Sequence, residues 1–248
     1  MKKKQSSDIL RLISEKNKSS CQINSNSGEN TTFINHYSYG ILRKHIELLE
    51  NFTSIHIDGI LLCIVLNRIG IPVRRLSFDM TSLAPAVFER ASRTNESIIL
   101  VGGETGVARI AASNFCQKHP GLNIIAVYSG FFPPERPKED VLNEIRSAAP
   151  DIVICGMGTP RQEEFLDELT KAGWRGTGYT CGGFLHQTAK RGNTYYPTWA
   201  DKYNLRWLYR IYDEPKLFSR YTIDLIRFLY FFVHDYYRYK KYNQSTIR

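Results

Sequence analysis

Six short apolar segments that alternate with helical sequence patterns constrain the fold of this chain more than any other feature. The segments span residues 31–35, 54–57, 97–103, 122–132, 151–158 and 176–184. Alternation of this kind is typical of α/β proteins, in which right-handed helical crossovers join parallel strands. We therefore expect residues 32–194 to form a Rossmann-like, mostly parallel sheet with helices on both faces.

The two ends of the chain differ from this central part. Residues 1–31 combine a basic start with a Ser/Asn-rich stretch, which predicts an N-terminal extension and linker. Residues 195–248 show helical patterns without clear strands and hold more than half of the chain's aromatic residues. Of the net charge of +9, residues 190–248 contribute +7, from 12 Lys and Arg against 5 Asp and Glu. We expect a helical, basic C-terminal appendage.

The appendage suggests an anionic partner. A basic, aromatic segment suits phosphate-bearing substrates, nucleic acid or anionic lipid. The apolar residues that fall near a single helical face are Leu217, Tyr221, Leu225, Phe228 and Phe232. This face could lie on a membrane surface, or it could pack the appendage onto the rest of the protein. Charged residues in the same stretch argue against a helix that spans the bilayer.

The cysteines and the first residues bear on location. The five cysteines are odd in number, scattered and without a C-x-x-C pair, which fits a reducing compartment better than a disulfide framework or a zinc site. The basic start lacks the apolar core of a secretory signal. We expect a cytoplasmic protein that binds peripherally to the inner face of the plasma membrane.

The segment Asp151–Phe165, DIVICGMGTPRQEEF, is typical of a strand, a turn and a helix. Thr159 is a favourable N-cap, and Pro160 suits the first helical position. Glu163 and Glu164 then complement the helix dipole. The turn should lie at the carboxyl end of a parallel strand, where open α/β sheets bind their ligands.

Glycines recur at three predicted strand ends. One loop contains Gly102, Gly103 and Gly106, a second Gly156 and Gly158, and a third Gly182 and Gly183. Glycine lets backbone approach a ligand closely, and a helix N-terminus after such a turn suits phosphate. Tight turns without a ligand are the alternative for any one loop. Three such loops on one rim favour a nucleotide-binding cleft.

Asp58 is a candidate general base, because it follows an apolar strand and its carboxylate could accept a proton from an attacking hydroxyl. Capping of the next helix is the simpler alternative. Arg74 and Asp79 lie in PVRRLSFDM, where a surface pair is the alternative. The chain contains no Asp-x-Asp metal motif. An enzyme that breaks a sugar–diphosphate bond with these residues would need cationic side chains to stabilise the leaving group.

These segments together resemble the WecG/TagA/CpsF family of bacterial glycosyltransferases over roughly residues 32–221. The most specific match is GMGTPRQE, residues 156–163, which is similar to the family's G-x-G-x-P-K-Q-E. Asp58-Gly59 resembles an Asp-Gly motif, while Arg74 and Asp79 align with R-V-x-G-x-D. The segments VGGETGVARIAA, YSGFF and KRGNTYYPTWADKYNLRWLYRIYDEPKLFSRY are also similar to family segments.

The resemblance implies an inverting transfer of N-acetylmannosamine or a related hexose from a UDP-sugar, without a metal or other cofactor. The acceptor would be a polyprenyl-diphosphate-linked saccharide in cell-surface polysaccharide synthesis. On this resemblance Asp58 is the catalytic base, with Arg74 and Gln162 completing the catalytic set. The residues assigned to substrate binding are Asn35, Asp79, Gly102, Gly103, Gly106, Gly156, Gly158, Pro160, Glu163, Arg206 and Arg210. The appendage would bind to the membrane, and its arginines would contact the diphosphates.

Four positions depart from the family's pattern. Leu61 stands in place of a second glycine, and Phe33 occupies the position of a substrate-contacting threonine. Ser77 replaces another glycine, and His186 replaces an acidic residue. These positions fall near the expected sugar pocket, so they bear on the identity of the donor more than on the type of reaction.

Two other classes of protein are alternatives to a transferase. A non-catalytic nucleotide- or nucleic-acid-binding module would use the same basic, aromatic surface. That class gives the Gln162-Glu163 loop no role, and no RNA-binding signature is present, so we expect no nucleic-acid partner. An NAD(P) oxidoreductase would need the full glycine fingerprint and a spaced acidic residue. The sequence is also compatible with a homo-oligomer.

Overall fold

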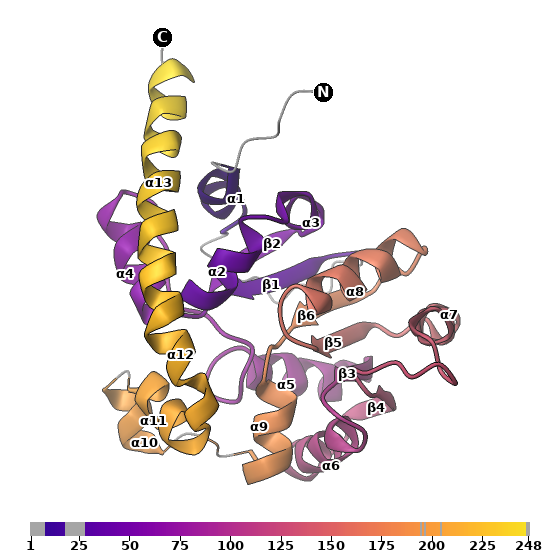
Figure 1. Cartoon of the computed structure of the whole chain (residues 1–248). Helices are drawn as coiled ribbons and strands as arrows, with labels where there is room; N and C mark the ends of the chain where they lie inside the picture. The colour runs from indigo at the N-terminus through magenta and orange to yellow at the C-terminus, as the bar shows by residue number, and fades with distance from the viewer. Residues whose placement is uncertain (1–7, 18–27, 194, 196, 204, 247–248) are drawn as a thin grey trace.

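The computed structural model describes residues 8–17, 28–193, 195, 197–203 and 205–246. Six strands form one sheet in the order β2-β1-β6-β5-β3-β4, and all neighbouring strands are parallel (Figure 1). The strands are β1 (Asn30–Ile34), β2 (Ser54–Ile57), β3 (Ser97–Gly102), β4 (Asn123–Tyr128), β5 (Ile152–Gly156) and β6 (Thr177–Thr180). Each predicted strand segment overlaps one of them, so the predicted α/β class is confirmed.

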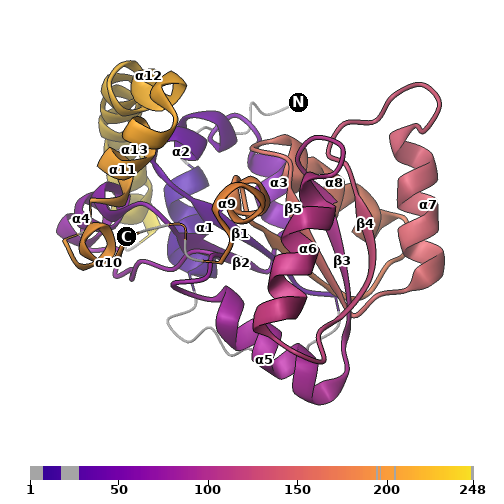
Figure 2. The same ribbon diagram turned by 90° about the horizontal axis from the view of Figure 1, so that it is seen from below.

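Helices cover both faces of the sheet, as predicted (Figure 2). They are α2 (His36–Leu42), α3 (Ile46–Asn51), α4 (Ile60–Arg68), α5 (Ala84–Thr94), α6 (Val107–Lys118), α7 (Lys138–Ala148), α8 (Arg161–Lys171) and α9 (Phe184–Arg191). Ile98 and Leu100 of β3 pack with α5, α6 and α9 on one face. Ile99 and Val101 pack with α7 and α8 on the other. Because both faces of β3 are covered, its residues Ile98–Val101 are apolar throughout rather than alternating.

The N-terminal helix α1 (Asp8–Lys16) belongs to the core, which differs from the prediction of a peripheral extension. Ile9, Leu10 and Ile13 are fully buried, because α1 packs against β2, α3 and the last helix, α13 (Ile223–Thr246). Residues 18–27, the remainder of the predicted linker, lie outside the described residues.

The appendage is helical, as predicted, and continues through α10 (Thr198–Lys202), α11 (Arg206–Asp213), η1 (Pro215–Leu217) and α12 (Phe218–Tyr221) into the long α13 (Figure 1). One face of α13 packs onto α2, where Phe228 and Phe232 meet the Tyr39 ring with centroid distances of 5.4 and 5.9 Å. Both phenylalanines are buried. The apolar face noted in the sequence therefore attaches the appendage to the body of the protein.

An ionic joint ties α11 to the end of α9. The Asp213 carboxylate accepts hydrogen bonds from Lys190 at 3.0 Å and from the Tyr195 hydroxyl at 2.8 Å, and it also pairs with Arg191. Although burial opposes the shift, these partners lower the pKa of Asp213 to about 2. These contacts hold α11 of the appendage against the C-terminal end of α9. In the described part of the chain, no helix has the length and apolar character needed to cross a membrane.

Candidate active site

A cavity of about 740 Å³ lies where the carboxyl ends of the strands meet the appendage. Asn35 after β1 and Asp58 after β2 line it on one side. Gly158 and Gln162 line it after β5, and α11 contributes Arg210 from the appendage. This is the rim at which open α/β sheets bind ligands.

The structure brings eight of the predicted site residues together at this cavity. They are Asn35, Asp58, Asp79, Gly103, Gly158, Gln162, Arg206 and Arg210. Six others do not line it. These are Arg74, Gly102, Gly106, Gly156, Pro160 and Glu163.

Asp58 lies directly after the buried Ile57 of β2, and its side chain lines the cavity. The helix that follows begins at Ile60 with Gly59 as its N-cap, so Asp58 does not cap it. Burial, reinforced by the negative charge of Asp79, raises the pKa of Asp58. A carboxylate with a raised pKa is a stronger proton acceptor once ionised, which suits a general base.

Arg75, not Arg74, reaches the cavity. Its Nε donates to the Asp58 carbonyl oxygen at 3.0 Å, and its positive charge opposes the rise in the Asp58 pKa. Arg75 pairs with Ile57 at the end of β2, and the Leu76 amide donates to the Ile57 carbonyl at 2.8 Å. Because Val73 is anchored in the core, the neighbouring Arg74 is directed outwards and is exposed. Arg74, the predicted catalytic arginine, therefore does not line the cavity, whereas its neighbour Arg75 does.

Arg206 and Arg210 of α11 bring positive charge from the appendage. The Arg206 guanidinium pairs with Asp79 at 3.1 Å and also donates to Thr81, so it connects the loop before α5 to the appendage. Around the whole cavity, the basic side chains are Arg75, Arg161, Arg206, Arg210, Lys216 and Arg220, and the acidic ones are Asp58, Asp79, Glu104 and Glu214. The excess of basic groups suits an anionic ligand.

Both polar atoms of the Gln162 carboxamide are hydrogen-bonded. Its Oε1 accepts from the Gly182 amide at 3.0 Å, and its Nε2 donates to Glu163 Oε1 at 3.0 Å. Glu163 was predicted to bind substrate, but it is completely buried and does not line the cavity. Helix α8 begins at Arg161 with Pro160 as N-cap, one residue later than predicted. The Thr159 hydroxyl bonds to Glu163 at 3.3 Å instead of capping the helix.

Asn35 caps helix α2 and also lines the cavity. Its Oδ1 caps α2 by accepting from the amides of Tyr37 and Ser38, both at 3.0 Å. The cap uses the oxygen, so the amide NH₂ is the group that Asn35 offers to a ligand in the cavity.

Two of the predicted loop glycines are required by packing between strands. Gly102 at the end of β3 has a φ of +152°, and a Cβ there would collide with the Gly156 backbone of β5. A Cβ on Gly156 would lie 3.0 Å from the Gly182 carbonyl oxygen, so close backbone packing, rather than a tight turn, accounts for both glycines. Gly158, with a φ of +76°, faces the cavity and has no neighbour where a Cβ would lie. It leaves room for a ligand beside the backbone.

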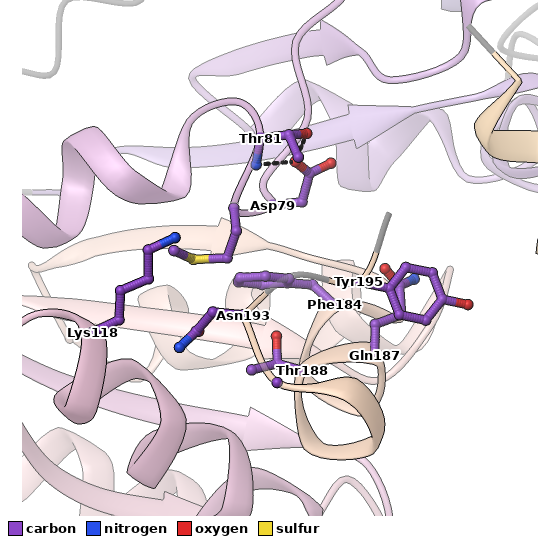
Figure 3. Close-up of a pocket in the computed structure, with 10 residues that line it drawn as sticks. Asp79, Thr81, Lys118, Phe184, Gln187, Thr188, Asn193 and Tyr195 are labelled. Atoms are coloured by element: carbon purple, nitrogen blue, oxygen red, sulfur yellow. Dashed lines mark hydrogen bonds between the residues drawn. The ribbon is translucent and has the colours of Figure 1, made fainter. Parts of the chain in front are cut away.

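A smaller pocket of about 160 Å³ opens beside this cavity (Figure 3). Figure 3 shows Phe184, Gln187 and Thr188 of α9 on one side and Asp79 with Thr81 on the other. Asp79, Phe184 and Gln187 also line the large cavity. The small pocket is therefore a side branch of the large cavity, and neither Asp58 nor Gln162 lines it.

Arg220 is a cavity residue that the sequence did not single out. Its guanidinium lies over the Tyr37 ring at 4.3 Å, and its carbonyl oxygen is 3.0 Å from His36 Nε2. Burial lowers the pKa of His36, so the neutral ring donates to this carbonyl. No local spacing in the sequence indicates that the start of α2 would hold the appendage in this way.

A Rossmann-like sheet with a carboxylate and an excess of basic side chains in a cavity at its rim is an arrangement that suits an enzyme acting on an anionic ligand. The sequence model of the WecG/TagA/CpsF family of glycosyl transferases matches residues 21–242, and the chain belongs to this family. It is therefore a glycosyltransferase rather than a non-catalytic binding module. A curated relative from Shigella boydii, a UDP-Gal:alpha-D-GlcNAc-diphosphoundecaprenol beta-1,4-galactosyltransferase, is 36% identical over 205 residues, which cover 82% of this chain and 85% of the relative.

Proposed function

We propose that this glycosyltransferase moves a hexose, with galactose as the first candidate, from a UDP-sugar to a polyprenyl-diphosphate-linked saccharide at the inner face of the plasma membrane. The proposal places it in cell-surface polysaccharide synthesis, with inversion at the anomeric carbon and without a metal. The similarity to the galactosyltransferase supports the donor and the acceptor. The observation that carries the proposal is the meeting of Asp58, Gln162 and cationic side chains in one cavity.

In this mechanism Asp58 takes the proton from the acceptor hydroxyl. The hydroxyl oxygen forms a bond to the anomeric carbon while the bond from that carbon to the β-phosphate oxygen breaks, and UDP leaves with the electron pair. Attack opposite the leaving group inverts the anomeric configuration. Arg75 and Arg210 border the same cavity and would stabilise the charge that develops on the diphosphate. Gln162 and the backbone at Gly158 would bind the donor.

Transfer from UDP-galactose is the direct test. The purified full chain is expected to release UDP when it is given UDP-galactose and a lipid-linked GlcNAc-diphosphate, and the product should carry a β-linked galactose. UDP-GlcNAc, UDP-glucose and UDP-N-acetylmannosamine are offered in parallel, because Phe33, Ser77 and His186 depart from the family near the sugar. Transfer from another of these sugars would change the donor; transfer from none of them would overturn the reaction.

We also propose that the outward face of α13 lies on an anionic membrane. The large apolar residues exposed along this face are Ile223, Ile226, Tyr230, Val233 and Tyr237, which recur at intervals of three and four residues. Lys240 and Lys241 are exposed further along the same helix. An apolar face bordered by lysines suits the interface of an anionic bilayer, where each cation contributes roughly 1 kcal/mol.

Point variants test the membrane proposal better than truncation, because the opposite face of α13 is part of the core. The double variant I223E/I226E is expected to bind phosphatidylglycerol vesicles roughly tenfold or more weakly, since it adds two negative charges and removes two apolar side chains from the contact. The matched control is I110E/I125E, which changes two exposed isoleucines on α6 and β4. Equal binding of both double variants in vesicle co-sedimentation would contradict the proposal.

A further inference from the structure

A buried carboxyl group lies behind the cavity, next to the proposed donor-binding Gln162. Glu163 is fully buried, and its Oε1 accepts from Thr32 Oγ1 at 2.9 Å and from Gln162 Nε2 at 3.0 Å. Thr180, which lines the cavity, donates to Thr32 at 3.1 Å. A chain of hydrogen bonds therefore runs from the cavity wall through Thr32 to Glu163 and back to Gln162.

The contacts of Gln162 leave one orientation of its carboxamide. The Gly182 amide is a donor and requires the Gln162 oxygen, whereas the Glu163 carboxylate is an acceptor and requires the Gln162 nitrogen. A rotation of 180° would place NH₂ against an N–H group and oxygen against a carboxylate, so both contacts would become repulsive. The charge on Glu163 thus selects which polar atoms Gln162 presents to the cavity.

We propose that Glu163 is a positioning residue, which acts through Gln162 and holds its carboxamide in the orientation that transfer requires only while Glu163 is ionised. The inference rests on the proposed function of Gln162 as a donor-binding residue. Glu163 itself touches neither substrate, since it is buried behind the cavity wall.

The surroundings of Glu163 make its ionisation sensitive to neutral pH. Burial raises the pKa of Glu163 to about 7, although the hydrogen bonds from Gln162, Thr32 and Thr159 oppose the rise. The titratable group on β5 that is coupled to it is the Cys155 thiol, whose own pKa burial raises well above its usual value. Thr32 on β1 and Thr180 on β6 are neutral. The side chains that hydrogen-bond to Glu163, those of Thr32, Thr159 and Gln162, are all uncharged.

Protonation weakens the hold on Gln162. Glu163 Oε2 is buried without a hydrogen-bond partner, so a proton added there removes the negative charge without gaining a contact. Charge-assisted hydrogen bonds are roughly twice as strong as neutral ones. Transfer should therefore increase as the pH rises through about 7, in addition to the ionisation of Asp58 at its own pKa.

The test is the pH dependence of hexose transfer by the full chain, with UDP-hexose as donor and UDP titrations beside it. E163Q carries a neutral isostere at every pH, so kcat is expected to fall roughly tenfold at pH 8 and the step near pH 7 to disappear. Its matched control is E164Q, the same change at the next, partly exposed residue of α8, which should keep the wild-type profile. T32V removes the hydrogen bond that Thr32 donates to the ionised Glu163, so the step should shift to a pH that is higher by roughly one unit.

The outcomes separate this inference from the proposed function. If the wild type transfers hexose and E163Q still shows the step near pH 7, the positioning role alone is overturned. Absence of transfer by the wild type from every UDP-hexose would overturn the proposed function, and this inference with it. Should E163Q fail to fold, the shift of the step in T32V decides the question. Loss of the step in E163Q, with UDP affinity changed less than kcat, supports the inference; if E163Q does not fold, a step that moves to higher pH in T32V supports it and an unmoved step overturns it.

Discussion

Asp58→Asn is expected to lower kcat by about 10²–10⁴-fold, the usual contribution of a positioned general base. Asparagine keeps the shape of the side chain but cannot accept the proton of the acceptor hydroxyl. The affinity for UDP should change little, because the base acts on the acceptor and not on the nucleotide. Initial rates of UDP release, together with UDP titration by calorimetry, measure the two quantities separately.

The pH profile gives the same experiment a second readout. Burial and Asp79 raise the pKa of Asp58, so wild-type transfer should fall as the pH drops through this raised value and the carboxylate is protonated. The variant should lack that dependence. Asp140→Asn changes an exposed aspartate on α7 in the same way and should leave turnover near the wild-type value. Near-normal turnover of the Asp58 variant would remove Asp58 from the role of base.

The strands were predictable because the sheet is covered on both faces. Such strands have continuous apolar segments, for example Ile98–Val101 in β3 and Ile152–Cys155 in β5, which stand out from their surroundings without any knowledge of the partners. Helix α1 was not recognised as part of the core. Its short apolar face becomes meaningful only when β2, α3 and α13 are brought beside it, and these come from distant parts of the chain.

The candidate site shows a similar limit at the level of single residues. Asp58 directly follows β2, and Gln162 lies in the first turn of the helix after β5, so the strand positions fix the place of both residues at the rim. Successive side chains in this segment point to opposite sides, so the burial of Val73 turns Arg74 outwards and Arg75 towards the cavity. The pairing of Arg75 with Ile57 of β2 sets this register. A local pattern of two arginines contains no information on that register.

Glu163 shows how a correct local rule can mislead. Acidic residues in the first turn of a helix complement its dipole, and Glu163 and Glu164 both satisfy that rule. In the structure Glu164 is partly exposed, whereas Glu163 turns inwards to Thr32 and Gln162. The hydroxyl of Thr32 comes from β1, more than a hundred residues away along the chain, so the sequence around Glu163 could not reveal the contact.

Asp235→Ala is expected to lower the free energy of unfolding by about 3–5 kcal/mol, the usual cost of removing one partner from a buried ion pair. The Asp235 carboxylate is fully buried and accepts from Arg43 at 2.6 and 2.9 Å and from the Tyr39 hydroxyl at 3.0 Å. Without it, the Arg43 side chain, which is 10% exposed, would remain charged and without this partner between α2 and α13. Urea unfolding followed by circular dichroism measures the loss.

A matched variant and a double-mutant cycle separate the ion pair from the helix that carries it. Asp224→Ala removes an aspartate of the same helix that pairs at the surface with Arg227, and should cost no more than about 1 kcal/mol. The variant R43A/D235A should lose less stability than the two single variants combined, because the second substitution removes a charge that the first had already left unpaired. Simple additivity of the single losses would show that the pair does not hold α13 to α2, and the apolar contacts of Phe228 and Phe232 would then be the attachment of the appendage.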